Sequence, residues 1–172
     1  MRNACRSLGL AILVTAASGA LAPAIAAADE RGAVTLSPSA KSGVPEGLTE
    51  SQWMNATGTA AVVDRGGGTG TIELEASGLV PNGVYTVWWV NPGTISTDMG
   101  PGGGVPGNEF TADPQGNARA TITADVGSGY EMMVVAYHAD DQTHGETPGD
   151  MGTQTFEHLM GPWPGSEGTM SE

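Results

Sequence analysis

The residues best suited to chemistry gather in one late segment of the chain, where all three histidines of the sequence lie. Imidazole nitrogens, carboxylate oxygens and thioether sulfurs are the donor atoms that proteins offer to zinc and copper. The same segment supplies all three kinds, so we predict a Cu or Zn site there. The candidate ligands are His138, His144 and His158, with Met151, Met160 and Asp140 as further donors.

The spacing of these histidines leaves a second interpretation open. His138 and His144 are six positions apart, and His144 and His158 are fourteen apart. Neither interval is a recognised ligand spacing. In the alternative interpretation the segment is a polar loop whose imidazoles hydrogen-bond backbone groups. Whether the three rings meet in space decides between the two.

Other common chemistries lack the residues they need. Cys5 is the only cysteine and lies in the N-terminal signal described below, so the exported chain has neither a thiolate ligand nor a disulfide. No Gly-x-Ser-x-Gly elbow marks a serine nucleophile. A loop read from Asp140 puts Met151 where an EF-hand needs a bidentate glutamate. We therefore name no catalytic residue and expect a binding module rather than an enzyme.

The charge of the chain excludes one class of partner. Asp and Glu number 19 against 6 Lys and Arg, for a net charge of −13. Loss of Arg2 and Arg6 with the signal leaves 4 basic against 19 acidic residues, or −15. Such a surface repels phosphate backbones and anionic lipid heads. Acidic faces of this kind are typical of a solvated, soluble surface, and attraction of cations is the alternative. We expect no nucleic-acid partner, and the identity of a protein or small-molecule partner stays open.

The N-terminus is typical of a secretory signal peptide. Arg2 and Arg6 form a positively charged start. An apolar run, Leu8–Val14, follows, and small residues lead to Ala28. We predict cleavage after residue 28 and export to the periplasm or the extracellular space. No later stretch is apolar enough to span a bilayer, so no membrane span is expected after processing.

Short strands separated by glycine and proline turns must position the candidate ligands. Residues 71–76 alternate apolar and polar side chains, which predicts a strand with one buried face and one face in water. Residues 84–90 are apolar on both faces, which predicts a central strand covered on both sides, and residues 131–137 are expected to form a second strongly apolar strand. His138 directly follows the second of these strands.

Turn residues mark the rest of the expected sheet. Residues 108–112 and 118–124 flank an Asp-Pro-Gln-Gly-Asn sequence, which predicts a β-hairpin. Residues 91–107 hold six glycines and three prolines, which indicates an irregular loop. Residues 153–159 are expected to form the last strand. About seven or eight strands without a helical period predict an all-β fold, an antiparallel Greek-key β-sandwich or flattened barrel.

These patterns divide the chain into four parts. The last part is rich in Pro, Gly and Ser, a composition that indicates a frayed end. The parts are a signal peptide (1–28), a lead-in segment (29–55), the β-sandwich domain (56–160) and a flexible tail (161–172). Within the lead-in, residues 33–36 are compatible with a short strand and residues 49–55 with a helical turn.

Four stretches of the chain resemble one known family. Residues 58–60 and 72–83, the latter reading Ile-Glu-Leu-Glu-Ala-Ser-Gly-Leu-Val-Pro-Asn-Gly, resemble the opening strands of Cu/Zn superoxide dismutase-like and CHRD-type domains. Residues 111–118 are similar to that family's Ala-Asp-x-x-Gly turn. Residues 134–141, Val-Val-Ala-Tyr-His-Ala-Asp-Asp, are similar to the stretch in which the family places a late copper-ligand histidine. The resemblance implies a Greek-key sandwich.

The resemblance does not extend to the family's activity. The family's copper centre uses four histidines, two of them as His-x-His on the central strand. This chain has three histidines, and its residues 87–91 read Val-Trp-Trp-Val-Asn. The family's disulfide is also excluded, because the exported chain has no cysteine. We expect no classical superoxide dismutase activity, and His138 at the matching position would be a remnant of that site.

The sequence favours a binding module over a metal-binding protein. The first is a secreted or periplasmic, non-enzymatic superoxide dismutase-like β-sandwich that acts as a binding or envelope-associated module. The alternative is an exported copper- or zinc-binding protein that uses the late histidines and is open to redox chemistry. A purely structural surface protein comes third, because repeats or an adhesive tail would favour it and the sequence shows neither.

Overall fold

The computed structural model describes residues 33–66, 69–94, 96–126 and 129–166, and the predicted signal peptide lies outside them. Every pairing between the strands of these residues is antiparallel. The predicted all-β antiparallel class is therefore confirmed. The elements are β1 (Val34–Pro38), α1 (Glu50–Trp53), β2 (Thr57–Gly66), β3 (Thr69–Ser77), β4 (Val84–Asn91), β5 (Asp98–Pro101), β6 (Glu109–Thr111), β7 (Ala118–Asp125), β8 (Met132–His138) and β9 (Thr155–Pro162).

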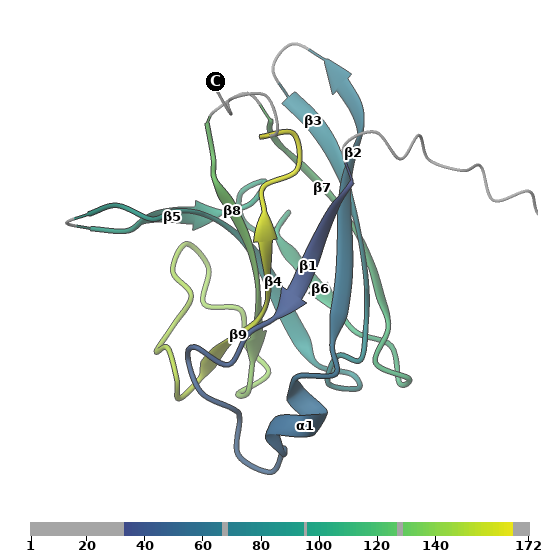
Figure 1. Cartoon of the computed structure of the whole chain (residues 1–172), viewed down its shortest axis with the longest axis vertical. Helices are drawn as coiled ribbons and strands as arrows, with labels where there is room; N and C mark the ends of the chain where they lie inside the picture. Colours follow the sequence, from purple (N-terminus) through teal and green to yellow (C-terminus); the bar gives the residue numbers. More distant parts are fainter. Residues whose placement is uncertain (1–32, 67–68, 95, 127–128, 167–172) are drawn as a thin grey trace, which may run out of the picture.

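The strands form one curled sheet whose two halves face each other as a half-barrel (Figure 1). Their order is β5-β4-β8-β9-β1-β2-β3-β7, and β6 pairs with β4 in addition. β1 joins the halves, because residues 34–36 pair with β2 and residues 37–38 pair with β9. In Figure 1 the half made of β1, β2, β3 and β7 lies on the right, and β4, β8 and β9 lie on the left.

The alternation predicted for residues 71–76 is confirmed in β3. Ile72 and Leu74 are buried in the core, while Glu73 and Glu75 are exposed on the outer face. Successive side chains of a strand point to opposite faces. This strand therefore contributes one apolar face to the interior and one charged face to water.

The strand predicted to be covered on both faces, β4, is indeed central, and the second apolar strand, β8, pairs beside it. β4 pairs with β8 on one side and with β5 and β6 on the other. Tyr85 and Val87 face the core between the two halves, while Trp88 lies in a second apolar cluster with Val134 and Ala136. Because residues of odd and even number point to opposite faces, this second cluster lies on the outer face. The segment 139–154, yellow-green in Figure 1, runs outside this half.

The hairpin predicted around residues 113–117 is wrong. β6 pairs with β4 and β7 pairs with β3, so the turn carries the chain from one half of the sheet to the other. The turn itself is tight, because the Asp113 carboxylate accepts backbone N–H groups of Gln115 and Asn117. β7 gains eight paired positions along β3, which a hairpin with the three-residue β6 would not provide.

The predicted loop and segment boundaries also differ from the structure. The expected irregular loop at residues 91–107 contains β5, whereas the lead-in holds β1 and α1 where a short strand and a helical turn are expected. Trp53 in α1 and Trp163 beyond β9 are each 1% exposed, so both belong to the core. The folded domain thus begins before residue 56 and continues past residue 160. No helix in the described part of the chain is long and apolar enough to cross a membrane.

Candidate metal centre

The end of β8 and the segment after it bring three predicted ligands together. His138 is the last residue of β8, and a turn at Asp141, whose φ is 59°, sends the chain back past the strand end. Asp141 N–H donates to the His138 carbonyl at 3.3 Å across this turn. One ligand atom each from His138, Asp140 and His144 lies within 4.8 Å of the others. We call this group the histidine–aspartate cluster.

Asp140 and His144 form the tighter pair of the cluster. Asp140 Oδ2 lies 3.1 Å from His144 Nε2, and Asp140 Oδ1 accepts the N–H of Gln142 at 3.3 Å. The two side chains of the pair are 25% and 21% exposed. His144 Nε2 is itself shielded from solvent and, among the described residues, makes no hydrogen bond of acceptable angle. Its near neighbour is the Asp140 carboxylate, to which it makes no aligned hydrogen bond.

Gly149 allows the His144 ring to take this position. Its φ is +81°, and a Cβ built on it would lie 2.5 Å from His144 Cδ2. Side chains rarely tolerate such a φ, and real Cβ contacts are never so short. With any larger residue at this position the His144 ring would have to shift and the backbone would be strained.

His138 is fully buried, and both of its ring nitrogens meet threonine hydroxyls. Nδ1 lies 3.1 Å from Thr155 Oγ1, and Nε2 lies 2.7 Å from Thr86 Oγ1. Thr155 donates its own proton to the Pro148 carbonyl, so it must accept from Nδ1–H. The Thr86 hydroxyl accepts from Trp88 Nε1–H at 2.7 Å and can then donate to Nε2. The network matches a neutral imidazole that carries its proton on Nδ1.

The electrostatic surroundings also keep His138 neutral. Burial lowers the pKa of His138 below the ordinary value of 6.5, and the charge of His144 acts in the same direction. The carboxylates of Asp140 and Glu109 oppose this and raise the pKa. The net lowering favours neutral imidazole at neutral pH. Neutral imidazole is the form that a metal ion binds.

The spacing of the cluster is close to what a small metal ion needs. Bonds of about 2.0–2.1 Å in a tetrahedral site place neighbouring ligand atoms roughly 3.4 Å apart. Asp140 and His144 already approach to 3.1 Å, whereas the group as a whole spans up to 4.8 Å. Binding would therefore draw the ligands together slightly and exchange one threonine hydrogen bond of His138 for the ion.

His158 lies elsewhere, on the core face of the same half of the sheet. Its ring stacks on Trp53 with centroids 3.6 Å apart, and its Nε2 lies 3.0 Å from the Trp53 carbonyl. Its Nδ1 lies 3.0 Å from Tyr85 Oη, which accepts the N–H of Val80. Tyr85 therefore donates to Nδ1 and Nε2–H donates to Trp53. Burial lowers the pKa of His158 to about 4.

The two methionines are placed differently again. Met160 is half-buried and packs against the outer-face cluster that contains Trp88. Met151 is 45% exposed, and its backbone forms an isolated bridge with Thr155. Their role as soft ligands stays a prediction.

The sequence alone does not single out the pairing of Asp140 with His144. Their separation of four positions, just after the end of a strand, is the pattern that could indicate it.

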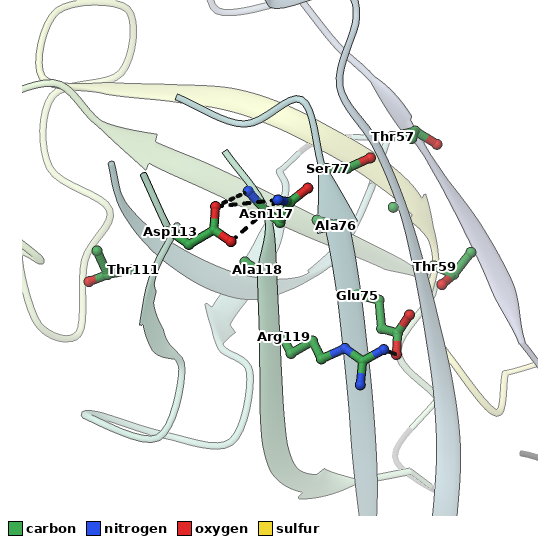
Figure 2. Close-up of a pocket in the computed structure, with 11 residues that line it drawn as sticks. Thr57, Thr59, Glu75, Ala76, Ser77, Thr111, Asp113, Asn117, Ala118 and Arg119 are labelled. Atoms are coloured by element: carbon green, nitrogen blue, oxygen red, sulfur yellow. Dashed lines mark hydrogen bonds and ion pairs between the residues drawn. The ribbon is translucent and has the colours of Figure 1, made fainter. Parts of the chain in front are cut away.

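A groove lies on the opposite half of the sheet, and its charged groups are an exposed ion pair and a turn-forming carboxylate. This groove of about 610 Å³ runs along β2, β3 and the start of β7 (Figure 2). Arg119 pairs with Glu75 at 2.9 Å, and both side chains are more than half exposed, so the pair contributes little. Asp113 has a lowered pKa, chiefly because it accepts the N–H of Asn117. Figure 2 shows these interactions as dashed lines.

The fold and the cluster together define an all-β domain with a candidate centre of two imidazoles and one carboxylate. Comparisons with protein-family models, with curated proteins and with solved structures found no match to this chain. The resemblance to superoxide dismutase-like domains therefore stays a prediction.

Proposed function

We propose that this chain is an exported, non-enzymatic binding module whose ligand is one Zn²⁺ or Cu²⁺ ion, held by His138, Asp140 and His144. One observation carries the proposal: the ligand atoms of these three residues lie within 4.8 Å of one another at the end of a rigid central strand. This proposal joins the two functions expected from the sequence, the binding module and the metal-binding protein, because the metal ion is the ligand of the module.

The chemistry of the donors supports this choice of metal. Two imidazoles and a carboxylate suit Zn²⁺ and Cu²⁺, whereas Cu⁺ prefers thiolate and thioether sulfur. A net charge of −13 raises the local concentration of cations near the surface. The signal-like N-terminus supports export. The third histidine is already bonded to Tyr85 and Trp53, which agrees with a simple binding site rather than a dismutase centre.

The test is calorimetric titration of the protein, exported from its own signal and without a polyhistidine tag, with Zn²⁺ and with Cu²⁺. We expect one ion per chain. His144→Ala should lower the affinity more than about 100-fold, because even outer-shell partners of a metal cost about 10- to 100-fold. Asp141→Asn is the matched control, since Asp141 is exposed and neighbours the cluster without belonging to it.

Two results would overturn the proposal. One is the absence of uptake of either ion by the folded protein. The other is uptake that His144→Ala and Asp140→Asn leave unchanged, which would place the ion elsewhere on the acidic surface. Equal losses in Asp141→Asn and Asp140→Asn would point the same way, to a general effect of negative charge.

A further inference from the structure

A second carboxylate, Glu109, is attached to the segment that carries the cluster. Thr143 Oγ1 donates to Glu109 Oε1 at 2.8 Å, although the two residues are 34 positions apart in the chain. Thr143 directly precedes His144. Glu109 is the first residue of β6, so this contact ties the segment to a second strand of the sheet.

The register of the sheet places Glu109 on the same face as the His138 ring. Glu109 lies directly opposite Thr86 in the pairing of β6 with β4. Directly opposite residues of an antiparallel pair point to one face, with Cβ atoms about 4.5–5.5 Å apart. Thr86 Oγ1 is the atom that lies 2.7 Å from His138 Nε2. The Glu109 side chain therefore leaves the sheet next to Thr86, whose hydroxyl contacts the His138 ring.

Glu109 is half-buried on this outer face and bonded to the residue just before His144. Its carboxylate is not one of the ligand atoms that lie within 4.8 Å of one another, so it must move to join the cluster. The candidate ligands thus come from three pieces of chain: the end of β8, the following segment and β6.

We propose that Glu109 is the fourth ligand of the metal ion, exchanging its hydrogen bond from Thr143 for the ion when the site is loaded. This inference rests on the proposed function and completes it as a site of two imidazoles and two carboxylates. Four protein ligands of nitrogen and oxygen are typical of a closed Zn²⁺ site, and the same donors suit Cu²⁺. Such a site joins β6 to β8 through the ion.

The competing role for Glu109 is to anchor the segment through Thr143 without touching the ion. The two roles differ in what Thr143→Val does. If Glu109 is a ligand, loss of the Thr143 hydroxyl releases the carboxylate and leaves the affinity unchanged or raises it. If Glu109 only anchors the segment, Thr143→Val lowers the affinity as much as Glu109→Gln does.

The experiment measures Zn²⁺ affinity and the visible spectrum of the Co²⁺-loaded protein for the wild type, Glu109→Gln, Thr143→Val and Glu73→Gln. Glu73 is the matched control, because it is an exposed carboxylate on the other half of the sheet. We expect Glu109→Gln alone to lower the Zn²⁺ affinity at least about tenfold. It should also weaken the intense d–d bands of four-coordinate Co²⁺. Glu109→Asp, a shorter carboxylate, is the second variant and should weaken binding if Glu109→Gln fails to fold.

The other outcomes separate the two proposals. Equal losses in Glu109→Gln and Thr143→Val with an unchanged Co²⁺ spectrum would overturn the fourth ligand in favour of the anchor. A wild-type affinity in Glu109→Gln, with binding still lost in His144→Ala, would overturn the fourth ligand and leave the three-residue site intact. Absence of metal uptake by the wild type would overturn both.

Discussion

Two buried histidines lie on opposite faces of the same half of the sheet, and their surroundings differ in kind. His138 on the outer face meets two threonine hydroxyls and lies near Asp140 and His144. His158 on the core face stacks on Trp53 and bonds to Tyr85. Both are 0–1% exposed, and burial lowers the pKa of each. Burial and a lowered pKa alone therefore do not distinguish a ligand from a core residue.

The companions of each ring make the distinction. Both histidines have their two ring nitrogens next to buried hydrogen-bonding groups, but His158 is surrounded by aromatic rings. His138 lies beneath a polar segment in which a carboxylate and a second imidazole are partly open to solvent. The first arrangement stabilises the fold, and the second can bind a charged ligand.

The largest expected effect is on stability, at His158. His158→Ala removes a stacked ring and leaves the Tyr85 hydroxyl and the Trp53 carbonyl without their partner. We expect the free energy of unfolding to fall by about 4 kcal/mol, as for a buried aromatic truncation that also orphans polar groups. Urea denaturation measures this. The folded fraction should still bind one Zn²⁺, and loss of metal binding with little loss of stability would reverse the assignment.

A slightly smaller effect is expected from acid. The pKa of His158 is about 4 in the folded protein against 6.5 for the free side chain, so the unfolded chain binds the proton more tightly. The stability due to neutral His158 is complete above pH 6.5 and is lost as the pH falls toward 4, by about 3 kcal/mol. Carboxylates titrate in the same range. The contribution of His158 is therefore the difference between the wild type and His158→Gln, and parallel stability curves would contradict it.

The face that each histidine occupies was only partly predictable. Simple alternation along β9 would put His158 on the same face as Met160, which is the outer face of His138. The register between β8 and β9 shifts after Val135, where Leu159 pairs with Val135 but Glu157 pairs with Ala136. The resulting β-bulge turns His158 to the core. No residue type in the sequence marks that bulge, so the expectation that all three histidines meet lacked this information.

Other parts of the fold could be predicted because the pattern of apolar and polar residues within one strand determines them. The alternation in β3 and the apolar runs of β4 and β8 each reflect burial against a neighbour, which side-chain type reports directly. The partners of β6 and β7 could not be predicted in this way. A tight turn joins them, yet each strand pairs with a different neighbour, and that choice depends on the whole sheet.

A moderate effect is expected at Gly149, which touches the cluster through the backbone. Gly149→Ala puts a Cβ against the His144 ring and strains a backbone with a φ of +81°. We expect a loss of about 2 kcal/mol in stability, and a lower Zn²⁺ affinity because the ring is displaced. Gly145→Ala is the matched control, since its φ is +70° but nothing lies within 4 Å of the added Cβ. Equal metal affinities in the two variants would show that the ring position does not matter.

The smallest effect is expected from the Asp140–His144 pair when no metal is present. Both side chains are between a fifth and a quarter exposed, and their contact is not an aligned hydrogen bond. Asp140→Asn in chelator should therefore change the free energy of unfolding by less than about 1 kcal/mol. The same substitution should abolish most of the stabilisation that added Zn²⁺ gives the wild type, because an ion that binds only the folded state stabilises it in proportion to its affinity. A large loss of unfolding free energy in chelator would instead show that the Asp140–His144 pair is a structural contact. The outer face around His138 would then stabilise the fold, as the core face around His158 does.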